Sequence, residues 1–229
     1  MHRIILTCAL AVVLTSTAFA GPTVRFDVTD IGWFEVELYD TTPISRDNFM
    51  AYVSAGLYNS TIIHRSDYSN GVIQGGGFIV PADPYVPEDL ATFGTIAYEG
   101  DIGGSNTVGT LGMARSSDPN SASSQWYINL QDNSGWFDHQ GDTPGYTVFG
   151  EVTAGWQTVL DIYALNVYNA SGAFYHGAFG TLPLMDSFDG SADLTQQDFV
   201  TIASVTPEPA TVALLALGGL ALLRRRARK

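Results

Sequence analysis

Short apolar segments separated by glycine- and proline-rich loops constrain the fold of this 229-residue chain more than any other feature. Apolar and polar residues alternate over residues 24–28 and 34–38, which predicts a hairpin with one buried face. Further short strand patterns lie at residues 62–65, 72–74, 95–99, 110–114, 125–130, 147–152 and 199–205. Helical patterns are too few to cover a parallel sheet. The sequence therefore predicts a mainly β protein, a closed eight-stranded antiparallel barrel capped by two helices.

Two segments carry helical patterns. The first helix is expected to begin after Thr42, with Pro43 in its first turn, and to end at Gly56. The second is expected over residues 155–165, where large apolar residues recur at helical spacing. Residues 168–198 are long, acidic and irregular, and their pattern predicts no regular structure.

Both ends of the chain have the composition of targeting segments. Residues 1–20 combine a short basic start, an apolar stretch and an A-x-A cleavage pattern, which indicates a signal peptide that is removed on export. At the other end, Pro207-Glu208-Pro209 precedes an apolar run over residues 210–223 and a basic terminus. A helix over this run rises about 21 Å, less than the roughly 30 Å hydrocarbon core, and its basic end favours the cytoplasmic side. A plain membrane anchor is one interpretation of this tail.

The domain expected between these ends, residues 21–206, is strongly acidic. It has four arginines and no lysine against 22 of the 23 acidic residues, a formal charge of −18. Such a surface repels phosphate backbones, which argues against nucleic-acid binding. The only cysteine, Cys8, lies in the expected signal peptide, so the mature chain has neither a disulfide nor a cysteine nucleophile.

The residues that most catalytic and metal sites need are scarce. The domain has three histidines, none of them paired, and no G-x-S-x-G sequence, which argues against a nucleophilic triad and a zinc site. The acidic residues over 186–193 lack the spacing of a calcium-binding EF-hand loop. We therefore expect no metal and no cofactor. Paired catalytic carboxylates remain open, because 22 acidic residues offer no discrimination.

The stretch over residues 64–78, HRSDYSNGVIQGGGF, combines an arginine with a glycine-rich strand pattern. Three consecutive glycines in such a pattern predict a bulge or a backbone that another segment approaches closely. Arg65 precedes them and Gln74 stands immediately before them. By spacing alone, a glycine-rich hairpin with a surface arginine is an equally good interpretation.

In their order, the segments of the chain resemble the cyclophilins, which are peptidyl-prolyl cis-trans isomerases with a β-barrel fold. The resemblance covers residues 24–205. It rests on NFMAYVSAGLY (48–58), HR (64–65), VIQGGGF (72–78), GTLGMAR (109–115), SDPNSASSQWYIN (117–129), WFD (136–138) and YTVFGEV (146–152). The tail over 207–229 resembles the PEP-CTERM sorting signal of Gram-negative bacteria, which implies recognition by an exosortase-type membrane protease.

The resemblance also implies site residues. Arg65 matches the essential arginine of the family and Gln74 the glutamine beside it. The residues that match the family's substrate-binding positions are Val72, Ala114, Arg115, Gln125, Tyr127, Trp136, Phe137 and Tyr146. The chain departs from the family after Arg65, where Ser-Asp-Tyr-Ser-Asn-Gly replaces a Pro-Gly-Phe loop and is one residue longer. Tyr68 is a candidate for the missing phenylalanine that floors the proline pocket.

The function implied is that of a secreted isomerase that speeds rotation about X–Pro bonds in exported proteins without a covalent step. The implied partners are proline-containing polypeptides and the sorting protease, with transient membrane insertion of the tail. We expect a monomer that is exported across the inner membrane and is then periplasmic, membrane-tethered or released to the cell surface. Two alternatives stay open: a catalytically weak surface protein that binds proline-containing segments, and a structural protein that binds calcium or carbohydrate.

Overall fold

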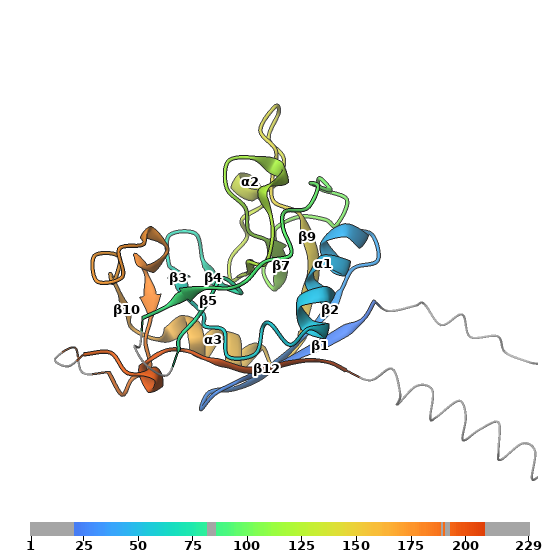
Figure 1. Ribbon diagram of the computed structural model, residues 1–229. Helices are drawn as coiled ribbons and strands as arrows, with labels where there is room; N and C mark the ends of the chain where they lie inside the picture. Colours follow the sequence, from blue (N-terminus) through green and yellow to red (C-terminus); the bar gives the residue numbers. More distant parts are fainter. Residues whose placement is uncertain (1–20, 82–85, 189, 191–192, 209–229) are drawn as a thin grey trace, which may run out of the picture.

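A computed structural model describes residues 21–81, 86–188, 190 and 193–208, and its largest element is one antiparallel sheet of eight strands (Figure 1). In spatial order the strands are β12 (Ile202–Pro207), β1 (Thr23–Val28), β2 (Gly32–Leu38), β9 (Val148–Ala154), β7 (Thr110–Met113), β8 (Trp126–Asn129), β4 (Val72–Gly75) and β3 (Arg65–Asp67). The first and last strands of the described residues, β1 and β12, therefore lie side by side. This arrangement confirms the prediction of a mainly β protein.

The sheet curls without closing, so the closed barrel that the sequence predicts is an overstatement. The edge strands β12 and β3 do not pair with each other. Instead, Ile62 forms an isolated bridge with Thr201, and the amide of Ile63 donates to the carbonyl of Val200 at 2.9 Å. These contacts join the segments that precede the two edge strands, and the result is a curled, half-closed barrel.

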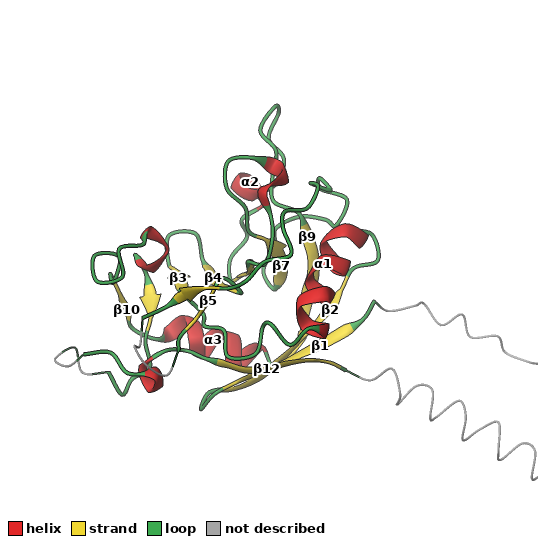
Figure 2. Ribbon diagram, in the orientation of Figure 1, coloured by secondary structure: helices red, strands yellow, loops and turns green. Residues whose placement is uncertain are grey.

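Two helices pack on this sheet, as predicted, and a third was not anticipated (Figure 2). Helix α1 (Pro43–Ser54) contacts β9 and β12, whereas α3 (Trp156–Ala164) contacts β2 and β4. Gly56 follows α1 with a φ of 68°, the left-handed conformation that favours glycine at a helix end. The third helix, α2 (Ser134–Phe137), is a single turn, too short to leave a periodic pattern in the sequence.

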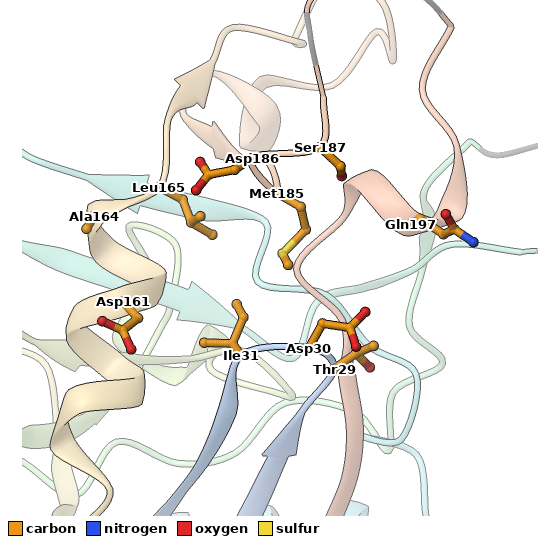
Figure 3. Close-up of a pocket in the computed structure, with 10 residues that line it drawn as sticks. All are labelled: Thr29, Asp30, Ile31, Asp161, Ala164, Leu165, Met185, Asp186, Ser187 and Gln197. Atoms are coloured by element: carbon orange, nitrogen blue, oxygen red, sulfur yellow. The ribbon is translucent and has the colours of Figure 1, made fainter.

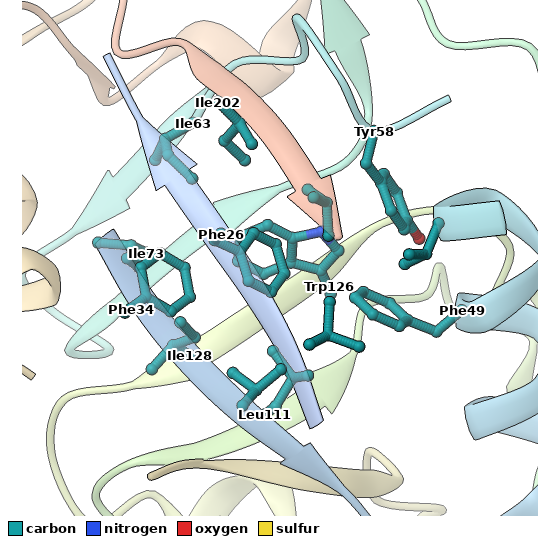
Figure 4. Close-up of a cluster of buried hydrophobic side chains, with 14 of the residues drawn as sticks. Phe26, Phe34, Phe49, Tyr58, Ile63, Ile73, Leu111, Trp126, Ile128 and Ile202 are labelled. Carbon is teal, nitrogen blue, oxygen red and sulfur yellow. The ribbon is translucent and has the colours of Figure 1, made fainter. Parts of the chain in front are cut away.

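Aromatic and aliphatic side chains together fill the interior of the curled sheet (Figure 4). Phe26 and Phe34 stack with ring centroids 4.6 Å apart, and Trp126 meets Phe26 edge-on at 5.1 Å. Phe49 brings α1 into the same cluster, with its ring 6.1 Å from that of Phe26. Inward-facing residues alternate with partly exposed ones along β1 and β2, which confirms the predicted hairpin with one buried face.

The three glycines of β4 and the turn after it make room for the side chains of Trp126 in β8 and of Gln125, the residue before β8. A Cβ atom on Gly75 or Gly76 would lie 2.9 and 2.8 Å from the indole ring of Trp126. One on Gly77 would lie 2.8 Å from the side chain of Gln125. The prediction that another segment closely approaches this backbone is therefore confirmed.

Two strand expectations need correction. Residues 95–99 form a loop, although the amide of Ile96 donates to the carbonyl of Ala122 at 2.9 Å. Residues 62–64 precede the strand β3 instead of belonging to it. Neither segment forms a continuous ladder with one partner. Residues 62–64 bond in turn to Phe78, Val200 and Gln74, which belong to three different segments.

The segment over residues 168–198 packs around a second hydrophobic cluster outside the barrel. Its short strands β10 (Val167–Tyr168) and β11 (Leu182–Pro183) pair with each other, and 3-10 turns lie at Gly177–Phe179 and Gln196–Asp198. The remaining short elements are β5 (Phe78–Ile79), paired with β6 (Glu88–Asp89), and a 3-10 turn at Pro119–Ser121. The buried members of the second cluster are Ile62, Phe78, Val80, Ala170, Phe179, Leu182, Leu184 and Phe199.

Among the described residues, no helix has the length and apolar character needed to cross a membrane. The expected signal peptide, residues 1–20, and the apolar run over 210–223 lie outside the described residues.

Candidate active site

Arg65 stands at the start of β3, directly opposite Gln74 on β4. Its guanidinium donates through Nη1 to Gln74 Oε1 at 3.5 Å and through Nη2 to Asp67 Oδ2 at 2.5 Å. Gln74 in turn donates to Gln125 Oε1 at 2.8 Å. The Arg65 side chain is 40% exposed, so the polar chain Asp67–Arg65–Gln74–Gln125 presents a fixed cation at the surface.

Asp67 holds the Arg65 side chain in place. Its side chain is only 12% exposed and accepts hydrogen bonds from the amides of Ser69 and Asn70 and from the Asn70 side chain. Burial raises the pKa of Asp67, but the hydrogen bonds from Asn70 and Arg65 outweigh burial and keep that pKa below its usual range. Asp67 is therefore ionised at neutral pH. Sequence reasoning missed this pairing, although an aspartate two residues after an arginine on a strand places both side chains on one face.

A cavity of about 110 Å³ opens beside the guanidinium. Its apolar lining comes mainly from three aromatic residues, with Phe137 and Tyr146 at 5.6 and 6.0 Å from the ring of Tyr127. Eight of the ten predicted site residues line this cavity. They are Arg65, Val72, Gln74, Ala114, Arg115, Tyr127, Phe137 and Tyr146.

Tyr127 is held rigidly on one side of this cavity. Its hydroxyl donates to Asn106 Oδ1 at 2.5 Å, and Asn106 donates to Asp138 Oδ1 at 2.9 Å. Burial raises the pKa of Tyr127 well above its ordinary value, so the phenol stays protonated. Gly112 on β7 makes room for the ring, since a Cβ atom there would lie 2.2 Å from it. Asn106 and Gly112 were not predicted as supports of the site.

Arg115 holds the loop that carries Tyr146. Its guanidinium lies 4.6 Å from the centroid of the Tyr146 ring and donates to the carbonyls of Gly145 at 2.9 Å and Pro144 at 2.5 Å. These contacts keep the Tyr146 ring against the cavity.

Two predicted site residues, Trp136 and Gln125, do not line this cavity, and neither does Tyr68, the candidate for the floor of the proline pocket. The side chain of Trp136 is 85% exposed, while its neighbour Phe137 lines the cavity. Gln125 lines an adjoining cavity of about 420 Å³. Tyr68 turns away, because its hydroxyl donates to the carbonyl of Leu165 at 2.7 Å and its ring meets Tyr163 at 4.9 Å. Tyr68 therefore does not replace the phenylalanine expected beneath the proline.

A larger cavity of about 900 Å³ lies between the β1–β2 turn, the end of α3 and residues 185–187 (Figure 3). Asp30, Asp161 and Asp186 surround it, and none of the predicted site residues lines it. Among the described residues, no three histidine, cysteine, aspartate or glutamate side chains are grouped so that they could hold a metal ion.

This combination of fold and site agrees with comparisons to known proteins. A profile described as "Cyclophilin type peptidyl-prolyl cis-trans isomerase/CLD" matches residues 23–174, and a PEP-CTERM protein-sorting motif matches residues 205–229. A peptidyl-prolyl cis-trans isomerase of Acinetobacter baylyi is 43% identical over 132 residues, which are 57% of this chain and 66% of that protein. Peptidyl-prolyl cis-trans isomerase A of Dickeya dadantii is 37% identical over 163 residues, 70% of this chain and 82% of that protein.

Solved structures show the same fold. A crystal structure of a cyclophilin type peptidyl-prolyl cis-trans isomerase of Cryptosporidium parvum has a TM-score of 0.54 at 19% identity, and the match covers 82% of this chain and 98% of that one. The chain belongs to the cyclophilin family, whose enzyme class is that of the peptidyl-prolyl cis-trans isomerases, EC 5.2.1.8. Within the family, it is a form that carries a PEP-CTERM sorting motif at its C-terminus.

Proposed function

We propose that this protein speeds the cis-trans isomerisation of X–Pro bonds in exported polypeptides, with Arg65 as the catalytic residue. The observation that carries the proposal is the Arg65 guanidinium, held by Asp67 and Gln74 at the edge of an aromatic cavity. The membership of this protein in the cyclophilin family supports the same activity.

The chemistry requires no nucleophile and no cofactor. Rotation about the bond faces a barrier of about 18–20 kcal/mol because amide resonance is lost in the twisted state. The prolyl nitrogen then gains a lone pair that accepts a hydrogen bond. A guanidinium has five N–H donors, and Asp67 and Gln74 engage two of those of Arg65, which leaves donors for this nitrogen.

The rest of the site holds the substrate while the bond turns. Val72, Tyr127 and Phe137 offer an apolar surface for the proline ring. Gln74 and Gln125 offer amide groups to the substrate backbone. Because Tyr127 is fixed by Asn106, the cavity is formed before the substrate binds, and the site favours the twisted state over both planar states.

The proposal is tested by measuring cis-trans exchange of an Ala-Pro peptide by NMR with substoichiometric protein. Uncatalysed exchange takes tens of seconds or longer, so we expect the protein to bring it onto the subsecond scale. Unchanged exchange rates at saturating peptide would contradict the proposal.

Proline-segment binding without catalysis is the second candidate, and the orientation of Tyr68 favours it because the cavity lacks that aromatic floor. Chemical-shift changes in the protein without faster exchange would identify this function instead.

The Gly112→Ala variant tests the role of the aromatic cavity. The new Cβ would meet the Tyr127 ring, so the ring has to shift, and overpacking of this kind costs about 1–3 kcal/mol of stability. We expect the variant to fold and to bind the Ala-Pro peptide about tenfold more weakly in an NMR titration. Gly135→Ala in α2 is the matched control, since its Cβ would meet nothing within 4 Å. Equal affinity in the two variants would argue against Tyr127 as a substrate contact.

We also infer that residues 1–20 are a signal peptide, that 21–206 form the isomerase domain, and that 207–229 are processed by an exosortase-type protease. The sorting-motif match over residues 205–229 supports this route. The protein would then act as a monomer on polypeptides outside the cytoplasm, in the periplasm, on the membrane or at the cell surface. The strong negative charge of the domain would keep it soluble there.

A further inference from the structure

The cavity of about 420 Å³ that adjoins Arg65 has a wall that comes from outside the region matched by the family profile. That match ends at residue 174, and the wall is formed by His176 and Ala178 around the 3-10 turn Gly177–Phe179. The turn is anchored by Phe179, which is buried in the second hydrophobic cluster. The residues that line this cavity are His64, Arg65, Gln74, Ala114, Arg115, Ser116, Ser121, Ser123, Gln125, His176 and Ala178.

The charge of this lining is opposite to that of the protein. The chain has 23 acidic residues, yet none of the aspartates and glutamates among the described residues lines the cavity, whereas two arginines and two histidines do. Asp67 offsets the charge of Arg65. Arg115, in contrast, has no carboxylate within 4.0 Å among the described residues and bonds only to backbone carbonyls. A net positive charge therefore faces this cavity.

The histidines add hydrogen-bond donors. His64 is 1% exposed, and among the described residues neither ring nitrogen makes a hydrogen bond of normal geometry, although the Gln125 side chain and the Ile62 backbone lie near the ring. Burial, and then the charge of Arg65, lowers the pKa of His64 to about 3, so the neutral ring keeps one N–H to donate. His176 Nδ1 accepts from the amide of Ala178 at 3.1 Å, which leaves its Nε2 as a donor. A buried polar group without a partner costs free energy that a ligand can recover.

We propose that this cavity is an acid-binding subsite, which takes a glutamate or aspartate side chain that lies near the proline of the substrate. The inference rests on the proposed function, because Arg65 and Gln74 line both cavities and so join the subsite to the site of rotation. Arg115 supplies the charge, His64 and His176 supply donors, and the wall around residue 177 restricts the space. The substrates selected are proline-containing segments that carry an acidic residue next to or close to the proline.

The test is a titration of ¹⁵N-labelled protein with acetylated, amidated peptides built around Ala-Pro or Pro-Ala. Each peptide carries glutamate, glutamine or lysine at one of the two positions before or the two positions after this dipeptide. At one position we expect glutamate to lower the Kd about tenfold relative to glutamine, the effect of one charge-assisted hydrogen bond. We expect lysine to raise the Kd. Because the subsite is partly open to solvent, the preference should shrink in high salt.

Variants identify the residues that recognise the negative charge of the peptide side chain. Arg115→Gln is expected to abolish the glutamate preference, and His176→Ala to reduce it. Arg115 also supports Tyr146, so the readout is the ratio of the two Kd values, which general damage to the site leaves unchanged. Arg25→Gln is the matched control, since Arg25 pairs with Asp27 on β1 and does not line the cavity. A glutamate preference that survives Arg115→Gln would overturn the assignment.

The same peptides separate this inference from the proposed function. Equal Kd values for glutamate and glutamine at every position would overturn the subsite, even where X–Pro exchange is accelerated. A glutamate preference without accelerated exchange would support the subsite and overturn the isomerase proposal. No binding of any peptide would overturn both.

Discussion

Replacing Arg65 by alanine is expected to lower kcat/KM for an Ala-Pro peptide by about 10²-fold while leaving the protein folded. The loss follows from the reaction proposed above, in which the guanidinium donates to the prolyl nitrogen only when the bond is twisted. An interaction made only in that state lowers the barrier, so its removal should reduce kcat and leave KM nearly unchanged. NMR exchange measured over a range of peptide concentrations gives both constants.

The fold should tolerate this change. The Arg65 side chain is 40% exposed, and an ion pair at such a position contributes about 0–1 kcal/mol after screening by solvent. Asp67 keeps its hydrogen bonds from Ser69 and Asn70 when the arginine is absent. A loss of activity in Arg65→Ala can therefore be attributed to the missing guanidinium and not to unfolding of the protein.

Arg25→Ala is the matched control for this experiment. Arg25 pairs with Asp27 at 3.0 Å, so both arginines contact an aspartate two residues further along the same strand. The two variants change the charge of the protein equally, and Arg25→Ala is expected to keep full activity. Arg65→Lys separates charge from geometry, and we expect intermediate activity because lysine lacks the planar fork. Full activity of Arg65→Ala would exclude Arg65 as the catalytic residue.

The regular elements were predictable because their signals are local. Alternation over residues 24–28 and 34–38 specifies which face of the hairpin is buried, and Pro43 and Gly56 mark the ends of α1. Each of these signals lies within a few residues of the element that it describes. The expected N-cap, Thr42, makes no side-chain cap, and the amides of Ile44 and Ser45 donate instead to Glu99. The barrel was overstated because closure depends on whether β12 and β3 pair, and whether two strands so far apart in the sequence pair is not specified by a local pattern.

The site was predictable only in part. Arg65 and Gln74 follow from the order of segments shared with the family, and spacing alone did not distinguish them from a surface hairpin. Of the adjacent aromatics Trp136 and Phe137, only Phe137 lines the cavity, because the single turn α2 sets their directions and leaves no pattern in the sequence.

The supports of the site were missed for a different reason. Asn106 reaches Tyr127 from a loop 21 residues earlier, and Gly112 opposes Tyr127 only because β7 and β8 pair in that register. Contacts of this kind depend on strand pairing and loop paths, which no local pattern encodes. The wall around residue 177 likewise depends on how an irregular segment packs its apolar residues against the barrel.

The largest loss of stability is expected for Trp126→Ala, about 3–5 kcal/mol of the free energy of unfolding. Trp126 is fully buried, its ring meets Phe26 at 5.1 Å, and it lies directly on the backbone of Gly75 and Gly76. Those glycines have no side chains that could move into the space, and β4 is paired on both sides, so the cavity left by the indole cannot collapse. Urea denaturation should show a lower midpoint with an unchanged m-value.

Trp136→Ala and Trp126→Phe make this result interpretable. Trp136 is 85% exposed, so its replacement should change the free energy of unfolding by no more than about 0.5 kcal/mol. Trp126→Phe should cost less than Trp126→Ala, because it keeps a ring against Phe26 and removes a buried indole N–H that has no partner among the described residues. If Trp126→Ala is no more destabilising than Trp136→Ala, then Gly75 and Gly76 are not required to accommodate the indole, and their role has to be sought in the substrate site beside them.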